Sequence, residues 1–356
     1  MKIGFIGLPN SGKTTIFNAL TKSKAEITAY ANTRGEPNLA VVEVIDERVT
    51  RLAEIYRPKK TTYAAIEFID FAGLSEGSGK GDAFSGTAMG LIKGVDALAL
   101  VIRNYPDDLM GMPSPLQDMD QIDLEMLVSD LAVVEKRLER IARFYQRGQK
   151  TEALQTEEKV LRKISAHLNG NQPVRTMELN GEEEKVIRGF QFLTKKPLMV
   201  ILNSHESNFG RNEDLLDEIG KKHGAIEFAG HFEMELSRLE DKAEALMFME
   251  DMGIERSARD RLTQFAYSLL GYISFFTVGA DEVRAWTIRR GETAVEAAGV
   301  IHSDLSKGFI RAECFSYNDL LECGSEKGVR EKGRFRLEGK NYVVKDLDIL
   351  SIRFNL

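Results

Sequence analysis

The chain is poor in cysteine and has no long run of uncharged apolar residues. Its only two cysteines, Cys314 and Cys323, lack the CxxC spacing of a zinc or redox motif. They predict reduced thiols rather than a disulfide framework, and they leave open a redox role for either thiol. No run of roughly 18 uncharged apolar residues is present, so no membrane span is expected. Met1-Lys2 leads straight into an apolar strand-like run without the features of an export signal, so we expect a cytoplasmic protein.

A net excess of positive charge is also missing. The 48 basic and 55 acidic residues give a net charge of −7, which excludes a globally basic, DNA-gripping surface. The five histidines form no metal-ligand or catalytic pattern. Residues 327–340 nevertheless hold six basic residues against two acidic ones, with Phe335 among them. This segment is interpreted either as an rRNA contact or as a solvated strand face.

Strand-like and helix-like segments alternate over the first hundred residues. Apolar runs at 2–6, 41–45, 64–70 and 97–103 are typical of strands, and 13–22 has the pattern of a helix. The alternation returns after Pro197, with a strand at 198–202, a helix at 212–223 and a strand at 226–229. This order predicts an α/β fold, in which helices cover a parallel sheet.

Two long helices are expected between these stretches. Apolar residues recur at alternating intervals of three and four, the a/d seam of a coiled coil. The seam consists of Leu124, Leu127, Leu131, Val134, Leu138, Ile141 and Tyr145. A second periodic segment runs from Leu154 to Leu168 and is ended by Gly170, Asn171 and Pro173. The pattern predicts an inserted helical hairpin, with two ordinary amphipathic helices on a core as the alternative.

The composition changes to short strands and turns from Phe275 onward. Strands are expected at 284–288, 310–314, 333–337, 341–344 and 348–354, with one helix around 292–301. These elements predict a small α+β domain. The expected division is therefore a discontinuous α/β domain at residues 1–118 and 196–274, a helical insert at 119–195 and a C-terminal domain at 275–356.

A phosphate-binding loop follows the first expected strand. Residues 7–14 read Gly-Leu-Pro-Asn-Ser-Gly-Lys-Thr and fit the pattern GxxxxGK[ST]. The glycines let successive N–H groups point at one anion, and the helix that begins near Lys13 adds its positive end. In this motif the lysine reaches the β- and γ-phosphates and the Thr14 hydroxyl ligates Mg²⁺. The predicted phosphate-binding residues are Asn10, Ser11, Gly12, Lys13, Thr14 and Thr15.

Two further motifs stand at the ends of expected strands. Asp70-Phe71-Ala72-Gly73 supplies an acid that can hold a Mg²⁺-bound water and a glycine N–H that can sense the γ-phosphate. Residues 203–206, Asn-Ser-His-Glu, stand where Ras-like GTPases carry NKxD to bind guanine. Glu206 is one methylene longer than Asp, so guanine preference should weaken. Asn203 either contacts the base, with Ser204 and Glu206, or braces the phosphate loop.

Together these residues resemble the YchF / Obg-like ATPase family of the P-loop GTPase class. The resemblance runs through nearly the whole chain and includes residues 7–14, 70–74, 80–81 and 203–206. It also includes family-specific stretches at 283–287 (Val-Arg-Ala-Trp-Thr), 307–313 (Lys-Gly-Phe-Ile-Arg-Ala-Glu) and 335–340 (Phe-Arg-Leu-Glu-Gly-Lys). It implies a Ras-like G domain, an inserted helical coiled-coil domain and a C-terminal TGS domain of ubiquitin-like β-grasp fold. It further implies binding and hydrolysis of ATP, with GTP weaker, and association with the ribosome; we expect a monomer.

The resemblance also assigns catalytic positions. Lys13, Asp70 and Gly73 are expected to act at the triphosphate, and Leu74 stands where many GTPases have a water-orienting Gln. A hydrophobic residue there implies slow intrinsic hydrolysis, because in-line attack depends on a positioned water. A partner, a monovalent cation or another switch residue would supply the missing group. Asn10 matches the asparagine that ligates K⁺ in some relatives, with a turn-stabilising role as the alternative.

Switch I departs most clearly from the family pattern. Residues 30–38 read Tyr-Ala-Asn-Thr-Arg-Gly-Glu-Pro-Asn, so Arg34 stands where the family has its metal-binding Thr. Three alternatives follow: Thr33, one position early, reaches Mg²⁺ after a loop shift, water replaces this ligand, or Arg34 adds charge near the phosphates. Residues 229–231, Ala-Gly-His, also differ from the usual base-contacting loop and leave the nucleotide preference open. These departures indicate a divergent paralogue.

Three functions are compatible with these features. The leading hypothesis is a Mg²⁺-dependent ATPase switch that reports its nucleotide state to a ribosome-like partner. The second is a GTP-hydrolysing translation or ribosome-assembly factor. The third is a nucleotide-sensing binding module whose switch I no longer supports hydrolysis.

Overall fold

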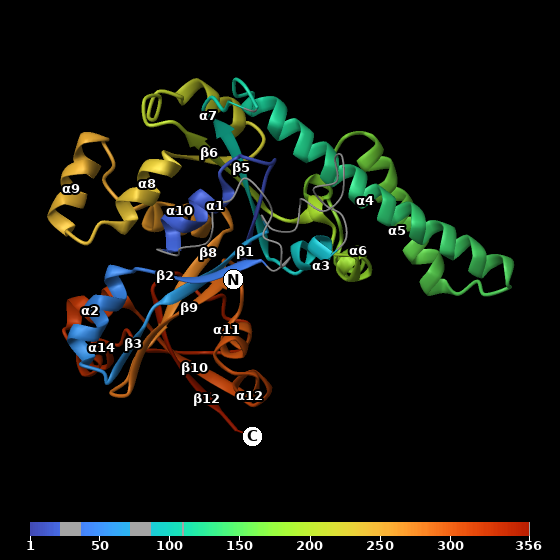
Figure 1. Ribbon diagram of the computed structural model, residues 1–356. Coiled ribbons are helices and arrows are strands. Elements are labelled where there is room, and N and C mark those ends of the chain that lie inside the picture. The colour runs from blue at the N-terminus through green and yellow to red at the C-terminus, as the bar shows by residue number, and fades with distance from the viewer. Residues whose placement is uncertain (22–36, 72–86, 109, 356) are drawn as a thin grey trace. The chain divides into compact units, whose positions relative to one another are not determined.

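The computed structural model describes residues 1–21, 37–71, 87–108 and 110–355, and Figure 1 traces their elements. The chain forms two compact units. The N-terminal unit consists of Lys2–Ala40 and Glu67–Ala258. The C-terminal unit consists of Met1, Val41–Ile66 and Arg259–Leu356.

The first sheet has six strands in the order β2-β4-β1-β5-β6-β7. The strands are β1 (Lys2–Ile6), β2 (Asn38–Val44), β4 (Ala64–Asp70), β5 (Ala97–Asn104), β6 (Leu198–Ser204) and β7 (Gly224–Phe228). From β4 through β1, β5 and β6 to β7, neighbouring strands pair in parallel. β5 and β6 are buried along their whole length, as expected of parallel strands between helices. The predicted α/β class is confirmed.

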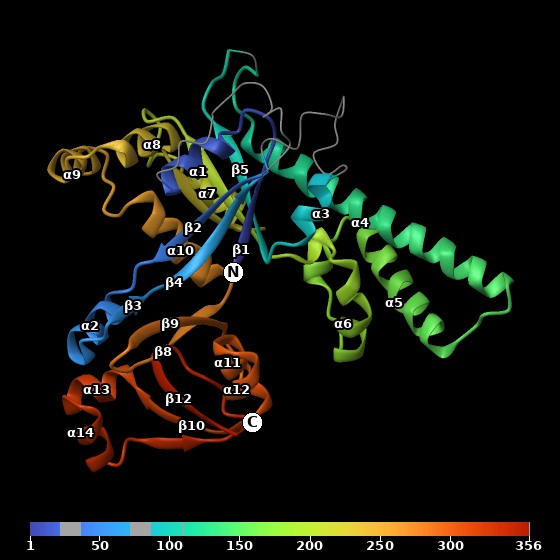
Figure 2. The same ribbon diagram turned by 60° about the horizontal axis from the view of Figure 1, so that its bottom comes forward.

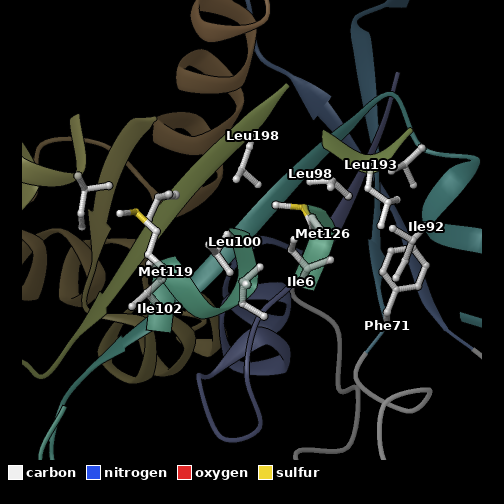
Figure 3. Close-up of a cluster of buried hydrophobic side chains, with 14 of the residues drawn as sticks. Ile6, Phe71, Ile92, Leu98, Leu100, Ile102, Met119, Met126, Leu193 and Leu198 are labelled. Carbon is white, nitrogen blue, oxygen red and sulfur yellow. The ribbon is translucent and has the colours of Figure 1, made fainter. Parts of the chain in front are cut away.

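Helices cover both faces of this sheet. Adjacent side chains of a strand point to opposite faces, so Phe5 and Ile6 of β1 enter different layers. Phe5 packs edge to face on Phe17 of α1 (Lys13–Thr21), with ring centroids 6.4 Å apart. Ile6 belongs to a second cluster with residues of α3 (Thr87–Lys93), α4 (Pro115–Gln146) and α7 (Glu213–Gly220). Figure 3 shows Met119 and Met126 of α4 over the strand residues of this cluster.

A helical hairpin is inserted between β5 and β6 of the same sheet, as predicted. Figures 1 and 2 both show α4 beside α5 (Glu152–Asn169). Val134 and Ile141 of α4 pack with Leu161 and Ile164 of α5 in a buried cluster. At the base of the hairpin, the buried Asp130 carboxylate accepts hydrogen bonds from the N–H groups of Leu193 (2.9 Å) and Thr194 (2.8 Å).

The expected seam is wrong at its first position. Leu124 is 54% exposed rather than packed against α5. The neighbouring Met119, Ile122 and Met126 are buried on the sheet instead, because the first turns of α4 lie on the sheet before the helix reaches α5.

The second sheet has the strand order β11-β10-β12-β8-β9-β3. Its strands are β3 (Lys60–Thr62), β8 (Tyr272–Thr277), β9 (Glu282–Arg289), β10 (Phe309–Ser316), β11 (Arg336–Glu338) and β12 (Asp348–Phe354). The pairs β8–β9, β10–β12 and β10–β11 are antiparallel, whereas β12–β8 and β3–β9 are parallel. Ala294, Ala297 and Ala298 of α11 (Ala294–Ile301) pack on this sheet with Phe275 and Leu350. The predicted C-terminal α+β domain is confirmed, and β3 joins it from far away in the sequence.

The remaining helices are short. They are α2 (Glu47–Tyr56), α6 (Gly181–Ile187), α8 (Gly230–Arg238), α9 (Lys242–Asp251), α10 (Ala258–Leu269), α12 (Ser303–Lys307), α13 (Tyr317–Cys323), α14 (Glu326–Glu331) and the 3₁₀ turns η2 (Val174–Thr176), η3 (Arg188–Phe190) and η4 (Leu193–Lys195). Among the described residues, no helix is long and apolar enough to span a bilayer.

The strand expected at 341–344 is wrong. This segment forms only one isolated bridge, between Val343 and Thr293. Its backbone instead closes the turn before α11, because the Ala294 N–H donates to the Tyr342 carbonyl and the Val344 N–H donates to the Glu292 carbonyl.

Candidate nucleotide-binding site

The glycine-rich loop between β1 and α1 has a backbone that requires its glycines. Gly7 and Gly12 have φ values of 149° and 89°. A Cβ at Gly7 would lie 2.4 Å from the Val101 carbonyl oxygen, and one at Gly12 would lie 2.1 Å from Asn203 Nδ2. Asn10 takes a left-handed conformation with φ of 58°, which Asn adopts more readily than most residues. Close contacts with β5 and β6 therefore restrict Gly7 and Gly12 of this loop to glycine.

Lys13 lies at the start of α1 and is almost fully buried. Its Nζ donates to the carbonyl oxygens of Gly7 and Leu8, both at 2.9 Å. These contacts hold the ammonium group against the curved loop. A phosphate bound in the loop would contact both this group and the N-terminal end of α1.

Thr14 and Asp70 meet although they are far apart in the sequence. The Thr14 hydroxyl donates to Asp70 Oδ2 at 2.8 Å, and Asn38 Nδ2 donates to the same oxygen at 3.3 Å. Asp70 is fully buried at the end of β4. Hydroxyl and carboxylate oxygens are ligands that Mg²⁺ accepts, directly or through water. Asn38 is the last residue of the switch I stretch 30–38, but the sequence assigned it no role of its own.

A cavity of about 370 Å³ adjoins the loop at the carboxyl end of the first sheet. Ligands of parallel α/β sheets bind at this edge. Its lining residues are Thr15, Tyr105, Asn203, Ser204, His205, Glu206, His231 and Phe232. The residues predicted to contact the base, Asn203, Ser204 and Glu206, are thus brought together with His231 of the divergent 229–231 loop.

Asn203 braces the phosphate loop. Its Nδ2 donates to the Ser11 carbonyl at 3.0 Å, and its Oδ1 accepts from the Gly230 N–H at 3.1 Å. The side chain is buried. A Cβ at Gly230 would lie 2.5 Å from Asn203 Oδ1, so Gly230 is needed for this approach. Of the two roles considered for Asn203, the structure contains the brace.

The buried acid Glu227 holds the Ser204 side chain in place, and the sequence did not identify this contact. The Ser204 hydroxyl donates to Glu227 Oε1 at 2.5 Å and accepts from Asn104 Nδ2 at 2.9 Å. Glu227 also accepts from Asn212 Nδ2 (2.5 Å) and from the Gly210 N–H (3.1 Å). Glu227 thus supports a residue of the cavity lining without lining the cavity itself. An acid in a short strand is typical of a solvated face, so no local signal identified this role.

Glu206 and His231 face each other at the cavity. His231 Nδ1 lies 3.8 Å from Glu206 Oε1, and both side chains are partly or largely exposed. This distance allows an ionic contact when the imidazole is protonated. The carboxylate of Glu206 thus remains available to accept hydrogen bonds from a ligand in the cavity.

Tyr105 links the cavity to the phosphate loop and was also missed. Its hydroxyl donates to the Asn10 carbonyl at 2.8 Å. Burial raises the pKa of Tyr105, so the hydroxyl remains a protonated donor at neutral pH. The buried Arg103 holds this segment by donating to the carbonyls of Tyr105 (2.6 Å) and Gly111 (2.8 Å).

Several predicted site residues lie outside the described residues. They are Thr33 and the rest of residues 30–36 of switch I, together with Gly73, Leu74 and the 80–81 stretch. Among the described residues, no group of three or more His, Cys, Asp or Glu side chains forms a metal site.

The basic segment 327–340 is extensively ion-paired. Arg334 pairs with Asp319 at 2.8 Å and with Glu322, and Arg336 pairs with Asp348 at 3.2 Å. Arg330 lies 3.6 Å from Glu313 and stacks over the Phe335 ring, 3.4 Å from its centroid. These carboxylates reduce the positive potential that an RNA backbone would meet.

The sheet order, the glycine-rich loop and the paired Thr14 and Asp70 define a P-loop protein of the GTPase class. Residues 2–142 match the family model MMR_HSR1, described as "50S ribosome-binding GTPase". Residues 272–355 match the model YchF-GTPase_C, described as "Protein of unknown function (DUF933)".

Full-length relatives identify the family. The chain is 38% identical to "Ribosome-binding ATPase YchF" of Bacillus subtilis, covering 99% of both chains. It is 39% identical to the protein of the same name from Haemophilus influenzae, over 100% of this chain and 99% of the relative. The "Structure of the Schizosaccharomyces pombe YchF GTPase" is similar with a TM-score of 0.82 and 32% identity, covering 99% of this chain and 97% of that one. The chain belongs to the YchF family, and its three parts are a P-loop G domain, a helical insert and a TGS-like α+β domain.

Proposed function

We propose that this protein binds ATP in preference to GTP, hydrolyses it slowly with Mg²⁺, and associates with the ribosome in the cytoplasm. One observation carries the proposal: the phosphate loop, the Thr14–Asp70 pair and the Glu206 cavity lie together at one edge of the sheet. The relatives named ribosome-binding ATPase, which match over the full length, support it. We also propose that the three domains meet after residues 118, 195 and 274.

Adenine and guanine differ in the groups that they present to Glu206. The adenine 6-amino group donates to a carboxylate, whereas the guanine O6 atom is an acceptor and is repelled by it. Guanine can still donate from N1 and N2, but a glutamate places its oxygens about one methylene farther out than the aspartate of NKxD. The carboxylate at the cavity therefore favours ATP.

The phosphates would be bound by this chain's own groups at the loop. Lys13 would exchange its Gly7 and Leu8 carbonyl partners for β- and γ-phosphate oxygens, with the backbone N–H groups of residues 10–15 around them. Asn203 and Tyr105 would hold the loop in shape through the carbonyls of Ser11 and Asn10.

Thr14 and Asp70 would hold Mg²⁺, Thr14 through its hydroxyl and Asp70 through a bound water. Their existing 2.8 Å contact places two oxygen ligands beside Lys13, and this donor set fits a hard cation. When bound, Mg²⁺ neutralises charge on the phosphate oxygens. Thr33 as a further metal ligand, and Lys13, Asp70, Gly73 and Leu74 as the catalytic set, remain predictions.

The exposed Asn10 would serve as a K⁺ ligand through its amide oxygen. Residues 327–340 would contribute to rRNA contact through the cations that are least compensated. Both assignments rest on the sequence and on the placement of these residues at accessible positions.

The second candidate function is a GTPase. It is favoured by the descriptions of one matching family model and one similar structure. The family model of residues 2–142 and the Schizosaccharomyces pombe structure both carry the word GTPase. The third, a binding module without turnover, is favoured by Arg34 in place of the switch I threonine.

A single-turnover assay of phosphate release with ATP and with GTP separates the three functions. We expect release from ATP that requires Mg²⁺, is slow alone and rises with ribosomes or K⁺. Phosphate release from GTP but not from ATP would support the GTPase. No phosphate release from either nucleotide under any condition would support the binding module.

Lys13→Ala tests the phosphate loop itself. We expect it to abolish triphosphate binding, whereas Lys159→Ala, at an exposed position of α5, should bind as the unaltered protein does. Unchanged affinity of Lys13→Ala would refute the assignment of the loop.

A further inference from the structure

A second cavity, of about 540 Å³, lies in the N-terminal unit. Thr194 of its lining lies in the η4 turn shortly before β6, and His223 directly precedes β7, whereas the nucleotide cavity lies where these strands end. Because the strands are parallel, the second cavity lies at their amino ends and the nucleotide cavity at their carboxyl ends. The five residues of β7 separate them by about 16 Å along the strand direction.

Three cationic side chains from two separate segments line this cavity. Arg175 comes from η2, and Lys221 and Lys222 follow α7. The two lysines are more than half exposed, whereas the Arg175 side chain is only 20% exposed. The cavity therefore has one largely buried guanidinium and two exposed ammonium groups.

The largely buried guanidinium is poorly satisfied by the protein. Arg175 Nη1 lies 3.3 Å from the Thr194 carbonyl, and Nη2 lies 3.5 Å from Asp123 Oδ1. These two long contacts serve a group that carries five N–H donors. Burial lowers the pKa of Arg175, and the nearby Asp123 carboxylate does not offset this cost of burying the charge. An anion in the cavity would satisfy the remaining donors.

The two acids of the cavity are already engaged. Asp123 Oδ2 lies 3.0 Å from Nε2 of the buried His223, and Asp120 Oδ1 lies 2.7 Å from Lys222 Nζ. Lys221 is paired with Glu218, which lies outside the lining, so each of the three cations already contacts one carboxylate. The pairs of both lysines are exposed, and such pairs contribute little, so the two ammonium groups can turn to an anion in the cavity. A phosphate monoester carries about −1.5 to −2 at neutral pH and attracts these cations more strongly than a single carboxylate does.

The cavity also has an apolar wall with room for an organic body. Leu124, Leu127 and Pro173 contribute to it, and Leu124 is the seam residue that is exposed here instead of packing on α5. Cavities of roughly 300–1,000 Å³ with apolar walls and a few convergent polar groups are typical of small-molecule sites.

We propose that this cavity binds a small phosphate monoester, with its phosphate on Arg175, Lys221 and Lys222 and its organic body against Leu124 and Pro173. The Arg175 fork would bind two phosphate oxygens, a geometry that guanidinium groups favour, and the lysines would approach as point charges. The site is separate from the nucleotide site and does not depend on the function proposed for it.

The test is calorimetric titration of the full chain with glucose 6-phosphate, glycerol 3-phosphate and AMP, with inorganic phosphate and citrate beside them. At least one ester should bind at millimolar concentration or tighter, more tightly than inorganic phosphate or citrate. Lys13→Ala should bind it unchanged, which excludes the phosphate loop as the source of the signal. No binding of any ester, or binding lost with Lys13→Ala, would overturn the proposal.

Variants at the cavity locate the binding. Arg175→Gln, which removes the charge and the guanidinium fork but keeps a polar amide, should weaken the ester about tenfold or more, as expected for a lost charged hydrogen bond. Lys221→Ala/Lys222→Ala changes only exposed side chains and provides the same test if Arg175→Gln fails to fold. The matched control is Lys136→Ala/Arg140→Ala, two exposed cations of α4, which should bind as the unaltered protein does. Equal affinity of the cavity variants and the control would refute the site.

Discussion

Replacing Asn203 by alanine tests whether this side chain holds the phosphate loop. The change removes the hydrogen bond from Nδ2 to the Ser11 carbonyl and the one from the Gly230 N–H to Oδ1, at 3.0 and 3.1 Å. Asn203 is 3% exposed, so water does not readily replace either partner. Two buried polar groups on different segments would be left without these bonds.

The expected cost follows from these two bonds. Each contributes roughly 0.5–1.5 kcal/mol, and leaving its partner buried and unsatisfied raises the loss, so we expect about 2–3 kcal/mol. A domain of 150–250 residues loses roughly 2–4 °C of melting temperature per kcal/mol. The transition of the N-terminal unit should therefore fall by about 4–12 °C without nucleotide, and ATP affinity should weaken with it.

Scanning calorimetry and titration with a fluorescent ATP analogue measure the two effects. Asn169→Ala is the matched control, because this exposed asparagine bonds only within the end of α5, and it should stay close to the unaltered protein. Asn203→Asp keeps an acceptor for Gly230 but turns an oxygen toward the Ser11 carbonyl, so it should be at least as harmful as alanine. A melting temperature of Asn203→Ala within about 1 °C of the unaltered protein would refute the brace.

Three further predictions concern single side chains. Glu206→Asp should raise the affinity for GTP relative to ATP about tenfold by bringing the carboxylate back to the guanine edge; titration of both nucleotides checks this, and an unchanged ratio would contradict it. Burial raises the pKa of Cys314 to about 12, so a thiol reagent at pH 8 should modify the more exposed Cys323 rapidly and Cys314 only after unfolding; two rapid equivalents would count against it. Hydrogen bonds from the Thr293 N–H and hydroxyl hold the pKa of Glu296 below its usual value, so its contribution is present above the unfolded-state pKa and lost as pH falls through the folded one. Glu296→Ala should cost about 1 kcal/mol at pH 7 and less in acid, which melting curves across pH measure; a cost independent of pH would contradict the capping role.

Most elements of the fold could be predicted from local sequence patterns. The bounds of β4 and β12, the hairpin and the helix after the phosphate loop follow from apolar periodicity and from glycine and proline positions, which act over a few residues. The pattern failed where the partner of a segment lies elsewhere in the chain. β3 pairs with β9 more than two hundred residues away, and residues 341–344 use their backbone groups on the turn before α11.

The candidate site divides in the same way. The sequence by itself determined the phosphate loop, the acid at the end of β4 and the acid in place of the guanine-binding aspartate, because each chemistry requires particular residue types at fixed short spacing. Only the tertiary structure decided that Asn203 braces the loop, that Tyr105 holds the Asn10 carbonyl, and that Glu227 lies beneath Ser204. It also decided that the N-terminal turns of α4, the η2 turn and the α7–β7 turn surround a cationic cavity. These contacts join segments far apart in the chain, and their existence depends on how the sheet and its helices pack rather than on any local pattern.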